Sequence, residues 1–471
     1  MTESIVVYGV ESLSHLKNSK KKIFVIEDDP KVQNVPAGCE FFFLETPLAI
    51  VSVLKQIAWK TLFLKTEVFA SAQYAKKSLW QKIETMFPDI ALGVFLTFSE
   101  FSDFGVKLYS NTYKNIKSTN KLWEIESLKN AFSGIPAIIV GAGPSLKKNG
   151  HMLKELSSKA LIFAGGSALN AMESLQVTPS FAAAIDKEAP FTTFKSQHFF
   201  EVPFLYQNRV SSENFSLVHG EKILAGDHEG FPLLTWLNEK LGLKSEVFQA
   251  GWNVSTFLIA VAKYFGCGPI ILVGMDLAFT ENKSYAEGSG LKEKEDGSHL
   301  VKVNDMAGNA VLTQKDWLMA AKWIEENHSI INCTEGGLGF GRQMSLQEAK
   351  RNLTLSYDLK GLVHQALYQT KSKTLSKSET YFKEIEANLH LFDFMVDEAM
   401  VELEKKYEKK PFEEYEDRFR NELVYNTLLQ PLWEIFQHIL LKDIKQEEIK
   451  ELNRLLFFKQ AIKEHLGAFK C

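Results

Sequence analysis

Short apolar runs that end in glycine or an acidic residue recur through the middle of the chain. Continuous apolar runs bounded in this way are typical of strands buried on both faces of a parallel sheet. Helix-like stretches separate them, which favours a mostly parallel sheet with helices on both faces over residues 121–350. The expected strands are residues 137–140, 160–164, 181–185, 202–206 and 269–276; the expected helices are residues 146–159, 168–175 and a helix opened by 249–256 that ends at Phe265.

The first 120 residues show the pattern of a separate α/β unit. Two strand-like runs, residues 5–9 and 23–28, flank a polar, helix-like segment, and the second run ends in acidic residues. This is the layout of a nucleotide-binding βαβ unit. The turn after the first run, Gly9-Val10-Glu11-Ser12, lacks the Gly-x-Gly-x-x-Gly spacing and places a carboxylate where a phosphate would bind. We therefore expect a Rossmann-like domain that does not bind a nucleotide.

The remaining residues up to about 132 are expected to add strands to the N-terminal sheet and to connect it to the central domain. Residues 61–64 and 92–96 are short apolar runs that we interpret as further strands. Residues 110–120 are polar and are interpreted as a linker, and residues 122–132 as a helix leading into the central domain.

From about residue 351 glycine becomes rare and charge density rises. Apolar positions from Phe382 to Leu403 alternate spacings of three and four, which predicts an apolar seam on one long helix. Further helices are expected over residues 422–441, interrupted at Pro431, and over residues 447–465. The pattern thus predicts domains 1–120, 121–350 and 351–471, the last an all-α helical domain. Its seam would pack on the rest of the protein or form a homo-oligomer with a second copy; a specific partner is the alternative.

Composition narrows the classes of partner and compartment. The 471 residues carry a formal net charge of −4 at pH 7, which gives no reason to expect nucleic acid or an anionic membrane as a partner. The 4 cysteines show no C-x-x-C spacing, so neither a zinc site nor a disulfide framework is predicted. No apolar stretch approaches the roughly 20 residues of a membrane helix, and the first residues do not read as a signal peptide. We expect a cytoplasmic protein with no membrane span.

Candidate chemistry begins at the turn Gly141-Ala142-Gly143-Pro144-Ser145, between an expected strand and an expected helix. Glycines let the backbone approach a ligand closely, and the unpaired N–H groups of a helix N-terminus attract phosphate. A tight turn with no ligand is the alternative, because Gly-x-Gly alone is a weak signal. Ser167, Asp186 and Asp276 also lie at the ends of expected strands, where ligands bind in open α/β sheets. We expect these strand ends to share one site.

The motifs of the central part occur in an order that resembles a known family. They are Ala137 to Leu146, Ser167-Ala168-Leu169, Ile185-Asp186, Gly266 to Thr280, and Ile331 to Gly337. The chain resembles the DUF115 domain of motility-associated factor (Maf) flagellin glycosyltransferases. That domain also occurs in archaeal 6-hydroxymethylpterin diphosphokinases and is similar in fold to CstII-type bacterial sialyltransferases. The three-part layout is similar to a Maf protein, so the resemblance implies an α/β fold with a central Rossmann-like, sialyltransferase-type domain and an N-terminal Rossmann-like domain.

The same resemblance implies a reaction and its binding residues. A nonulosonic, sialic-acid-like sugar would pass from a CMP-activated donor to a hydroxyl of a protein or surface acceptor such as flagellin, with no metal or other cofactor required. The loop from Gly141 to Ser145 would hold the nucleotide phosphates. The remaining residues implied or expected to line the pocket are Ser167 and Asp186 on the base or ribose side, Gly274 and Asp276 at the sugar–nucleotide junction, Glu335, Gly336 and Gly337 in a closing turn, and Asn253 and Ser255 at the start of a helix.

Such a reaction needs a proton donor near the leaving phosphate and a base for the acceptor hydroxyl, because its transition state is oxocarbenium-like. The candidate catalytic residues are Asp276, Tyr285 as the donor to the leaving phosphate, and His299 as the base. His228 is a second candidate base, and an ordinary loop position is the alternative for either histidine. Replacing Asp276 with alanine is expected to abolish turnover and to leave the fold intact.

Two other functions remain open. A diphosphokinase-like enzyme would transfer pyrophosphate from ATP to a hydroxymethyl heterocycle and would need Mg²⁺ to bind the ATP. A binding or scaffold protein would have kept the pocket and lost the chemistry. Stabilisation by CMP, stabilisation by ATP with Mg²⁺, and no response to nucleotides separate the three, since a ligand that binds only the folded state raises the melting temperature.

Overall fold

The first two apolar runs of the chain pair as parallel strands. In the computed structural model β1 (Glu3–Tyr8) lies between β2 (Lys22–Glu27) and β4 (Lys65–Ala70), and β3 (Cys39–Phe43) pairs with β2. All three pairings are parallel, and the order β3-β2-β1-β4 is that of a Rossmann half. Helix α1 (Ile50–Lys60) and the first part of α2 (Ser78–Ser118) pack on this sheet and share its core. The predicted N-terminal Rossmann-like fold is therefore confirmed.

An internal carboxylate fills the turn that follows β1. The side chain of Glu27, at the end of β2, is fully buried. Its oxygens accept hydrogen bonds from the N–H groups of Val10 at 2.9 Å, Asp28 at 2.9 Å and Asp29 at 3.0 Å, and from the Tyr74 hydroxyl at 3.2 and 3.3 Å. Burial, followed by the charge of Glu27, raises the pKa of Tyr74, so the phenol stays a donor. The carboxylate takes the place that a nucleotide phosphate has in a binding Rossmann turn.

Replacing Glu27 with glutamine is expected to destabilise this unit by about 2–3 kcal/mol, because an amide N–H₂ would face backbone donors and charge-assisted hydrogen bonds would be lost. Urea unfolding measures the change. Glu11→Gln, on an exposed side chain of the same turn, is the matched control and should change stability by less than about 0.5 kcal/mol. Equal, small effects of both substitutions would show that the buried carboxylate does not stabilise the turn.

Two expected strands and the expected linker are wrong. Residues 61–64 form a turn before β4, whereas residues 92–96 and most of residues 110–120 belong to the long helix α2. Buried positions along α2 recur every four or seven residues, at Ile83, Phe87, Val94, Phe101 and Leu108. This helical spacing extends over many turns, so it is a stronger signal than the strand pattern of the short apolar run at residues 92–96.

The expected helix over residues 122–132 is also wrong. It is replaced by β5 (Lys121–Glu124) and a short 3₁₀ helix, Ile125–Leu128. Trp123 pairs in parallel with Ile223 on one side and antiparallel with Ser372 of β16 (Ser372–Thr374) on the other. Because both partners lie far away in the sequence, no local pattern around residue 123 could reveal this strand.

The central part forms a ten-stranded sheet with the order β15-β14-β11-β6-β7-β8-β9-β10-β5-β16. Every pairing is parallel except that of β5 with β16. All residues of β6, β7, β8 and β11 are buried, so both faces of the sheet are covered. Its other strands run β6 (Ala137–Val140), β7 (Leu161–Gly165), β8 (Phe181–Ala184), β9 (Phe204–Tyr206), β10 (Lys222–Leu224), β11 (Ile270–Val273), β14 (Ile330–Asn332) and β15 (Arg342–Gln343).

The strand order reverses between β6 and β11. After β6 the chain adds β7, β8, β9 and β10 on one side, and it then returns to place β11, β14 and β15 on the other. In open α/β sheets such a reversal leaves a crevice at the carboxyl ends of the two strands, where ligands bind. The predicted α/β fold with a Rossmann-like central domain is confirmed.

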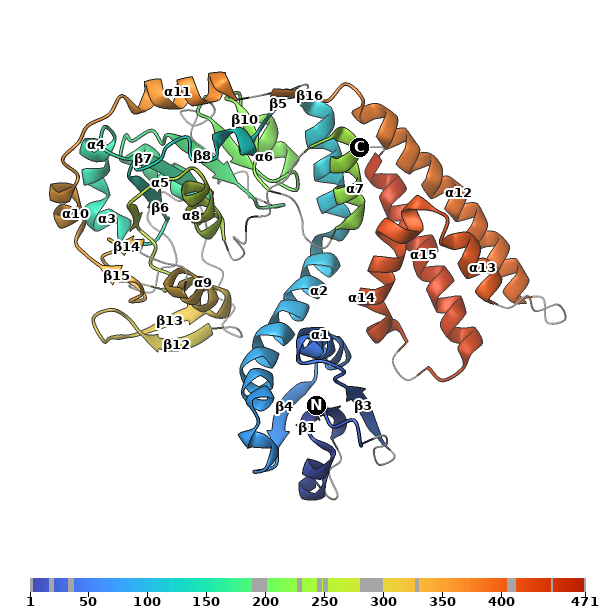
Figure 1. The fold of residues 1–471 in the computed structure, drawn as a ribbon. Coiled ribbons are helices and arrows are strands. Elements are labelled where there is room, and N and C mark those ends of the chain that lie inside the picture. Colours follow the sequence, from blue (N-terminus) through green and yellow to red (C-terminus); the bar gives the residue numbers. More distant parts are fainter. Residues whose placement is uncertain are drawn as a thin grey trace. The chain divides into compact units, whose positions relative to one another are not determined.

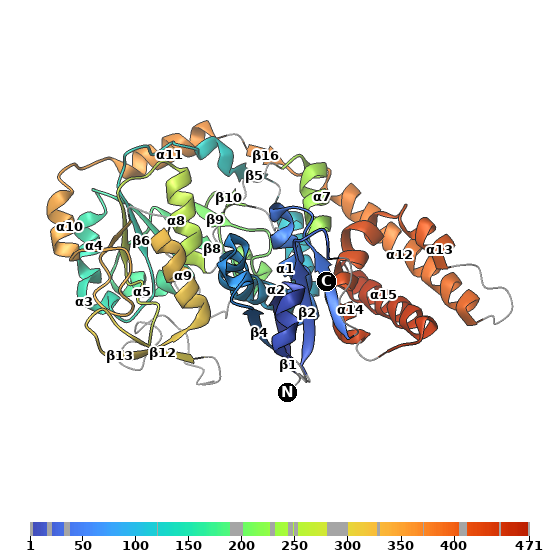
Figure 2. The same ribbon diagram turned by 60° about the horizontal axis from the view of Figure 1, so that its bottom comes forward.

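Helices cover both faces of this sheet, and α8 and α9 lie next to each other (Figures 1 and 2). The expected helix over residues 146–159 is instead split into α3 and α4 around Gly150, where a Cβ would lie 2.8 Å from the side chain of Leu175. The helices are α3 (Leu146–Asn149), α4 (Leu153–Leu156), α5 (Ser167–Ser174), α6 (Ser212–Ser216), α7 (Pro232–Leu241), α8 (Val254–Tyr264), α9 (Lys315–Glu326), α10 (Leu346–Asn352) and α11 (Leu359–Gln369), with a hairpin of β12 (Leu300–Asn304) and β13 (Ala310–Gln314).

The C-terminal region is helical, as predicted. It contains α12 (Ser378–Glu404), α13 (Phe412–Phe419), α14 (Gln430–Leu440) and α15 (Glu447–Phe469). The seam of α12 is buried, including Phe382, Leu389 and Val396. A π-helical turn, Tyr425–Leu429, precedes Pro431, whose missing N–H cannot continue a regular helix.

The structure describes residues 3–16, 21–32, 38–119, 121–188, 201–226, 231–243, 248, 253–279, 300–326, 330–370, 372–404, 412–441 and 444–469. They form two units, of which the first joins Met1–Gly105 with Asp393–Asn421 and Leu429–Ile462, and the second contains Val106–Phe392, Glu422–Leu428 and Lys463–Cys471. The three sequence domains stay a prediction about which segments fold independently. Among the described helices, none has the length and apolar character needed to cross a membrane.

Candidate functional site

The strand ends around the switch point bring most of the predicted residues to one edge of the sheet. Gly141 follows β6, Ser167 follows β7, and Asp186 lies two residues beyond β8. On the other side of β6, Gly274 and Asp276 follow β11, and Glu335 to Gly337 follow β14. Since these strands are parallel neighbours, their carboxyl ends meet at the same edge.

The turn after β6 packs directly against the turn after β11. The Gly141 N–H donates to the Val273 carbonyl at 2.8 Å, and the Gly143 N–H donates to the Gly274 carbonyl at 2.7 Å. A Cβ on Gly141 would lie 2.4 Å from the Gly274 oxygen. Glycine is therefore required here by the close approach of two backbones, whether or not a ligand binds.

The carboxylate of Asp276 fills the turn from Gly141 to Ser145. Its side chain is only 1% exposed. It accepts a hydrogen bond from the Ser145 hydroxyl at 2.5 Å and one from the Ser145 N–H at 3.1 Å. A Cβ on Gly143 would lie 2.1 Å from Asp276 Oδ1. The N–H group expected to hold a nucleotide phosphate thus already binds an internal anion.

The backbone of Asp276 is enclosed by the turn after β14. The Leu338 N–H donates to the Asp276 carbonyl at 2.8 Å, and a Cβ on Gly337 would lie 2.0 Å from the same oxygen. Next to it, the Met275 N–H donates to the Thr334 hydroxyl at 3.0 Å. Asp276 therefore joins the turns after β6, β11 and β14. Thr334 was missed by the sequence reasoning, although it precedes Glu335 in the last family-like motif.

Glu335 is held against α3. Its carboxylate accepts a hydrogen bond from Asn149 Nδ2 at 3.1 Å, and its carbonyl accepts one from Lys148 Nζ at 2.7 Å. Gly336, beside it, is half-buried, whereas Gly337 is buried. These contacts fix the turn after β14 on the helix that follows the Gly141–Ser145 turn.

The turn after β7 differs from the turn after β6, because no side chain among the described residues binds its N–H groups. Gly166 has φ +54° and precedes α5, whose N-terminus has no side-chain cap. The Ser167 side chain is half-buried and has no hydrogen-bond partner in the described parts of the chain. The first N–H groups of such a helix have no intrahelical acceptor.

Helix α8 begins beside this turn and caps itself. A Cβ on Gly165 would lie 2.4 Å from the side chain of Val254, the first residue of α8. The absence of a side chain at Gly165 therefore lets the helix approach β7. The Asn253 side chain accepts hydrogen bonds from the N–H groups of Ser255 at 3.0 Å and Thr256 at 2.9 Å. The Thr256 hydroxyl in turn accepts from the Asn253 N–H at 3.1 Å, which completes a capping box.

Asp186 lies at the end of the next strand along the edge. Its side chain is exposed, yet protein surrounds it on several sides, and this desolvation raises the pKa of its carboxyl against the opposing charges of Arg209 and Lys187. Two asparagines of α2, which the sequence reasoning missed, fix the loops here. Asn111 Nδ2 donates to the carbonyls of Lys187 and Arg209, and Asn115 Nδ2 donates to those of Asn208 and Val210.

Three predicted catalytic residues lie outside the described residues: Tyr285, His299 and the second candidate base, His228. Their roles stay predictions. Within the described ranges no group of three or more histidine, cysteine, aspartate or glutamate side chains is arranged to hold a metal ion.

Comparisons with known proteins agree with the motif-based resemblance. Residues 110–282 match the model of a family described as 6-hydroxymethylpterin diphosphokinase MptE-like. The chain is also similar to the solved structure of the MAf glycosyltransferase from Magnetospirillum magneticum AMB-1, with a TM-score of 0.61 and 15% identity, over 100% of this chain and 79% of that one. No curated protein matches the chain. The resemblance to DUF115 and Maf proteins is thereby confirmed, and at this identity the likeness to the solved structure concerns the fold.

Proposed function

We propose that this protein is a glycosyltransferase that binds a CMP-activated nonulosonic sugar at the carboxyl edge of its ten-stranded sheet and transfers the sugar to a hydroxyl of a protein or surface acceptor. The fold that it shares with a Maf glycosyltransferase supports this kind of activity. The identity of the donor, the identity of the acceptor and the independence of metal are supported only by the resemblance of the sequence motifs to those of Maf proteins.

One observation carries the placement of the donor: of the three helix starts around the switch point, only that of α5 has no side chain among the described residues bonded to the N–H groups at or just before its first turn. Asp276 binds the N–H of Ser145 before α3, and Asn253 binds the first N–H groups of α8. The N-terminus of α5 follows Gly166 and carries no side-chain cap. A helix N-terminus with unbonded N–H groups attracts phosphate through those groups and through the helix dipole.

The surroundings of the α5 N-terminus suit the rest of a nucleotide. The Ala142 N–H, in the half-buried part of the neighbouring turn, has no acceptor among the described residues. Asp186, at the end of the adjacent strand, is an exposed carboxylate that can accept hydrogen bonds from ribose hydroxyls. We therefore move the proposed phosphate position from the Gly141–Ser145 turn to Gly166 and Ser167.

A second candidate function follows from the family model. Residues 110–282 match a model described as diphosphokinase-like, and that activity would use ATP with Mg²⁺. Melting temperatures with CMP, CDP, UDP and ATP, each with Mg²⁺ and with EDTA, separate the candidates. Stabilisation by CMP in EDTA supports the glycosyltransferase, whereas stabilisation by ATP only with Mg²⁺ supports the diphosphokinase. No response to any nucleotide contradicts both.

Replacing Ser167 with aspartate tests the phosphate position directly. A carboxylate in the first turn of α5 should leave the melting temperature of the free protein unchanged or raised, because it interacts favourably with the helix dipole. The same carboxylate would repel a bound phosphate, so the affinity for CMP should fall by about tenfold or more, measured by calorimetry. Ser167→Asn, which has the same shape without the charge, is the matched control. Equal CMP affinities of the two variants would place the phosphate elsewhere.

A further inference from the structure

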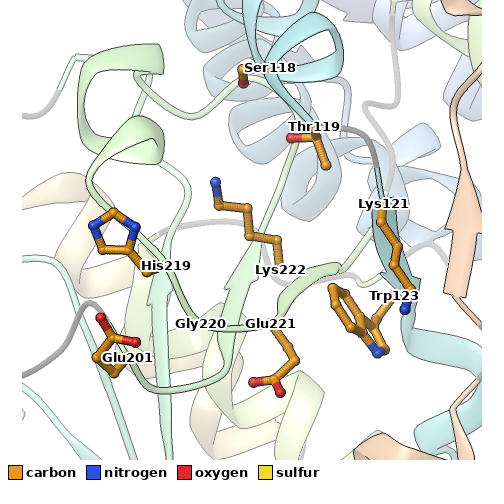
Figure 3. Close-up of a pocket in the computed structure, with 9 residues that line it drawn as sticks. All are labelled: Ser118, Thr119, Lys121, Trp123, Glu201, His219, Gly220, Glu221 and Lys222. Atoms are coloured by element: carbon orange, nitrogen blue, oxygen red, sulfur yellow. The ribbon is translucent and has the colours of Figure 1, made fainter.

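A second cavity opens at the opposite edge of the ten-stranded sheet. It has a volume of about 400 Å³, within the range usual for small-molecule sites. Glu201 precedes β9 and His219 precedes β10, and both strands run parallel to β5, so the cavity lies at the amino edge. Its lining residues are Ser118, Thr119, Lys121, Trp123, Glu201, His219, Gly220, Glu221 and Lys222 (Figure 3).

One buried hydroxyl of this cavity lacks a partner. Thr119, just beyond the end of α2, is 6% exposed, and its Oγ1 makes no hydrogen bond within the described part of the chain. Buried hydroxyl groups in folded proteins are almost always hydrogen-bonded, so an unpaired one marks a place for water or a ligand group. In Figure 3 the Thr119 hydroxyl and the Lys222 amine point into the same part of the cavity.

The charged side chains of the cavity are also unpaired. The Nζ atom of Lys222 lies 4.2 Å from the centroid of the Phe215 ring, and that of Lys121 lies 5.0 Å from the centroid of the Trp123 ring. Desolvation by burial lowers the pKa of Lys222. Neither lysine, nor Glu201 or Glu221, makes a side-chain hydrogen bond or an ion pair with another described residue. In Figure 3 the Lys222 and Glu221 side chains point away from each other, so unbonded donors and acceptors lie on both sides of the sheet edge around the cavity.

This mixture of groups selects the chemistry of the ligand. With two lysines and two glutamates the lining carries no net charge when His219 is neutral. The two lysines attract a phosphate or carboxylate, but the two glutamates and the carbonyl end of a long helix repel it, so the lining does not favour an anion. A neutral sugar presents hydroxyl groups that donate to carboxylates and accept from ammonium groups, and such charge-assisted bonds are the strong ones.

We propose that this cavity is a binding site for a neutral saccharide, separate from the donor site at the carboxyl edge. Glu201 and Glu221 accept hydrogen bonds from sugar hydroxyls, and Lys222 and the Thr119 hydroxyl bond to sugar oxygens. Trp123 contributes apolar surface beside them. The role of the site in the reaction rests on the glycosyltransferase function proposed above: it would hold a sugar unit of a glycan or glycosylated acceptor.

Calorimetric titration of the whole chain with glucose, galactose, mannose, N-acetylglucosamine and N-acetylgalactosamine tests the proposal. At least one of these sugars should bind, and glucuronate and glucose 6-phosphate should bind more weakly. The double variant Glu201→Gln, Glu221→Gln should weaken sugar binding by about tenfold or more, because charge-assisted hydrogen bonds are lost. The control pair Glu213→Gln, Glu239→Gln, outside the cavity, should bind as the natural chain does. No binding of any neutral sugar, preference for the anionic ones, or equal binding by both double variants would overturn the proposal.

Thr119→Val separates a ligand-binding hydroxyl from a structural one. Valine has the same shape and removes a polar atom that has no partner in the free protein, so the free energy of unfolding should stay the same or rise. Affinity for the sugar should nevertheless fall several-fold, because the bound sugar loses a hydrogen-bond partner. Loss of stability with unchanged sugar affinity would show that the hydroxyl serves the fold and would remove it from the site.

Discussion

Replacing Gly337 with alanine is expected to destabilise the protein by about 4 kcal/mol or more, the largest effect of any single methyl group around the candidate site. A Cβ at this position would lie 2.0 Å from the Asp276 carbonyl oxygen and 2.5 Å from its Cα. Both are backbone atoms, so no side-chain rotation can relieve the clash. Gly337 also has φ +72°, a left-handed conformation that alanine adopts at a cost of about 1–2 kcal/mol. Urea unfolding followed by tryptophan fluorescence measures the loss.

Gly341 supplies the matched control for this prediction. It lies in the same segment with φ +64°, but a Cβ there would meet only the Ile330 oxygen, at an ordinary contact distance of 3.6 Å. Gly341→Ala should therefore cost only the conformational part, about 1 kcal/mol. If both variants lose the same stability, the close approach of the β14 turn to Asp276 does not matter energetically.

Replacing Asp276 with alanine is expected to destabilise the protein by about 3–5 kcal/mol, because the N–H and the hydroxyl of buried Ser145 would both lose a charged acceptor. This differs from the expectation from sequence that the variant keeps its fold, since that expectation took Asp276 as an accessible catalytic group. Asp305→Ala is a matched control. Asp305 also accepts backbone N–H bonds, from Ala307 and Asn309, but it does so in an exposed turn, and its loss should cost about 1 kcal/mol.

Ser145→Ala separates the two hydrogen bonds that Asp276 accepts. It removes the hydroxyl bond and keeps the N–H bond, so it should cost about 1–2 kcal/mol. Combined with Asp276→Asn, the two changes should be non-additive by about 1 kcal/mol or more, since the residues are in direct contact. If Asp276→Ala unfolds at the same urea concentration as the natural chain, its contacts do not stabilise the turn, and a purely catalytic role for Asp276 would regain support.

The strand ends could be predicted from sequence because their signal is local. The strands β6, β7, β8 and β11 are continuous apolar runs that lead into glycine or an acidic residue, and this pattern placed Gly141, Ser167, Asp186 and Asp276 at one edge. The capping box of α8 was also within reach, because Asn253 and Thr256 have the spacing of an N-cap and its third residue. The helix α12 could also be predicted, because its apolar positions keep a helical spacing over many turns.

The occupant of the Gly141–Ser145 turn could not be predicted in the same way. A glycine turn that holds an external phosphate and one that holds an internal carboxylate need the same residues, and the carboxylate comes from a position 131 residues away. In the N-terminal unit, too, an internal carboxylate binds the turn: Glu27 accepts a hydrogen bond from the N–H of Val10. The strand β5 was missed for a related reason: its pairing partners, Ile223 and Ser372, are distant in sequence.

The central claim is that Asp276 already occupies the turn after β6, so that the donor phosphate binds at the turn after β7. A crystal structure of the complex with CMP tests this most directly. We expect the phosphate beside the N–H groups of Ser167 and its neighbours, with Asp276 still bound to Ser145. Phosphate density within the Gly141–Ser145 turn, with the Asp276 carboxylate displaced from Ser145, would contradict it.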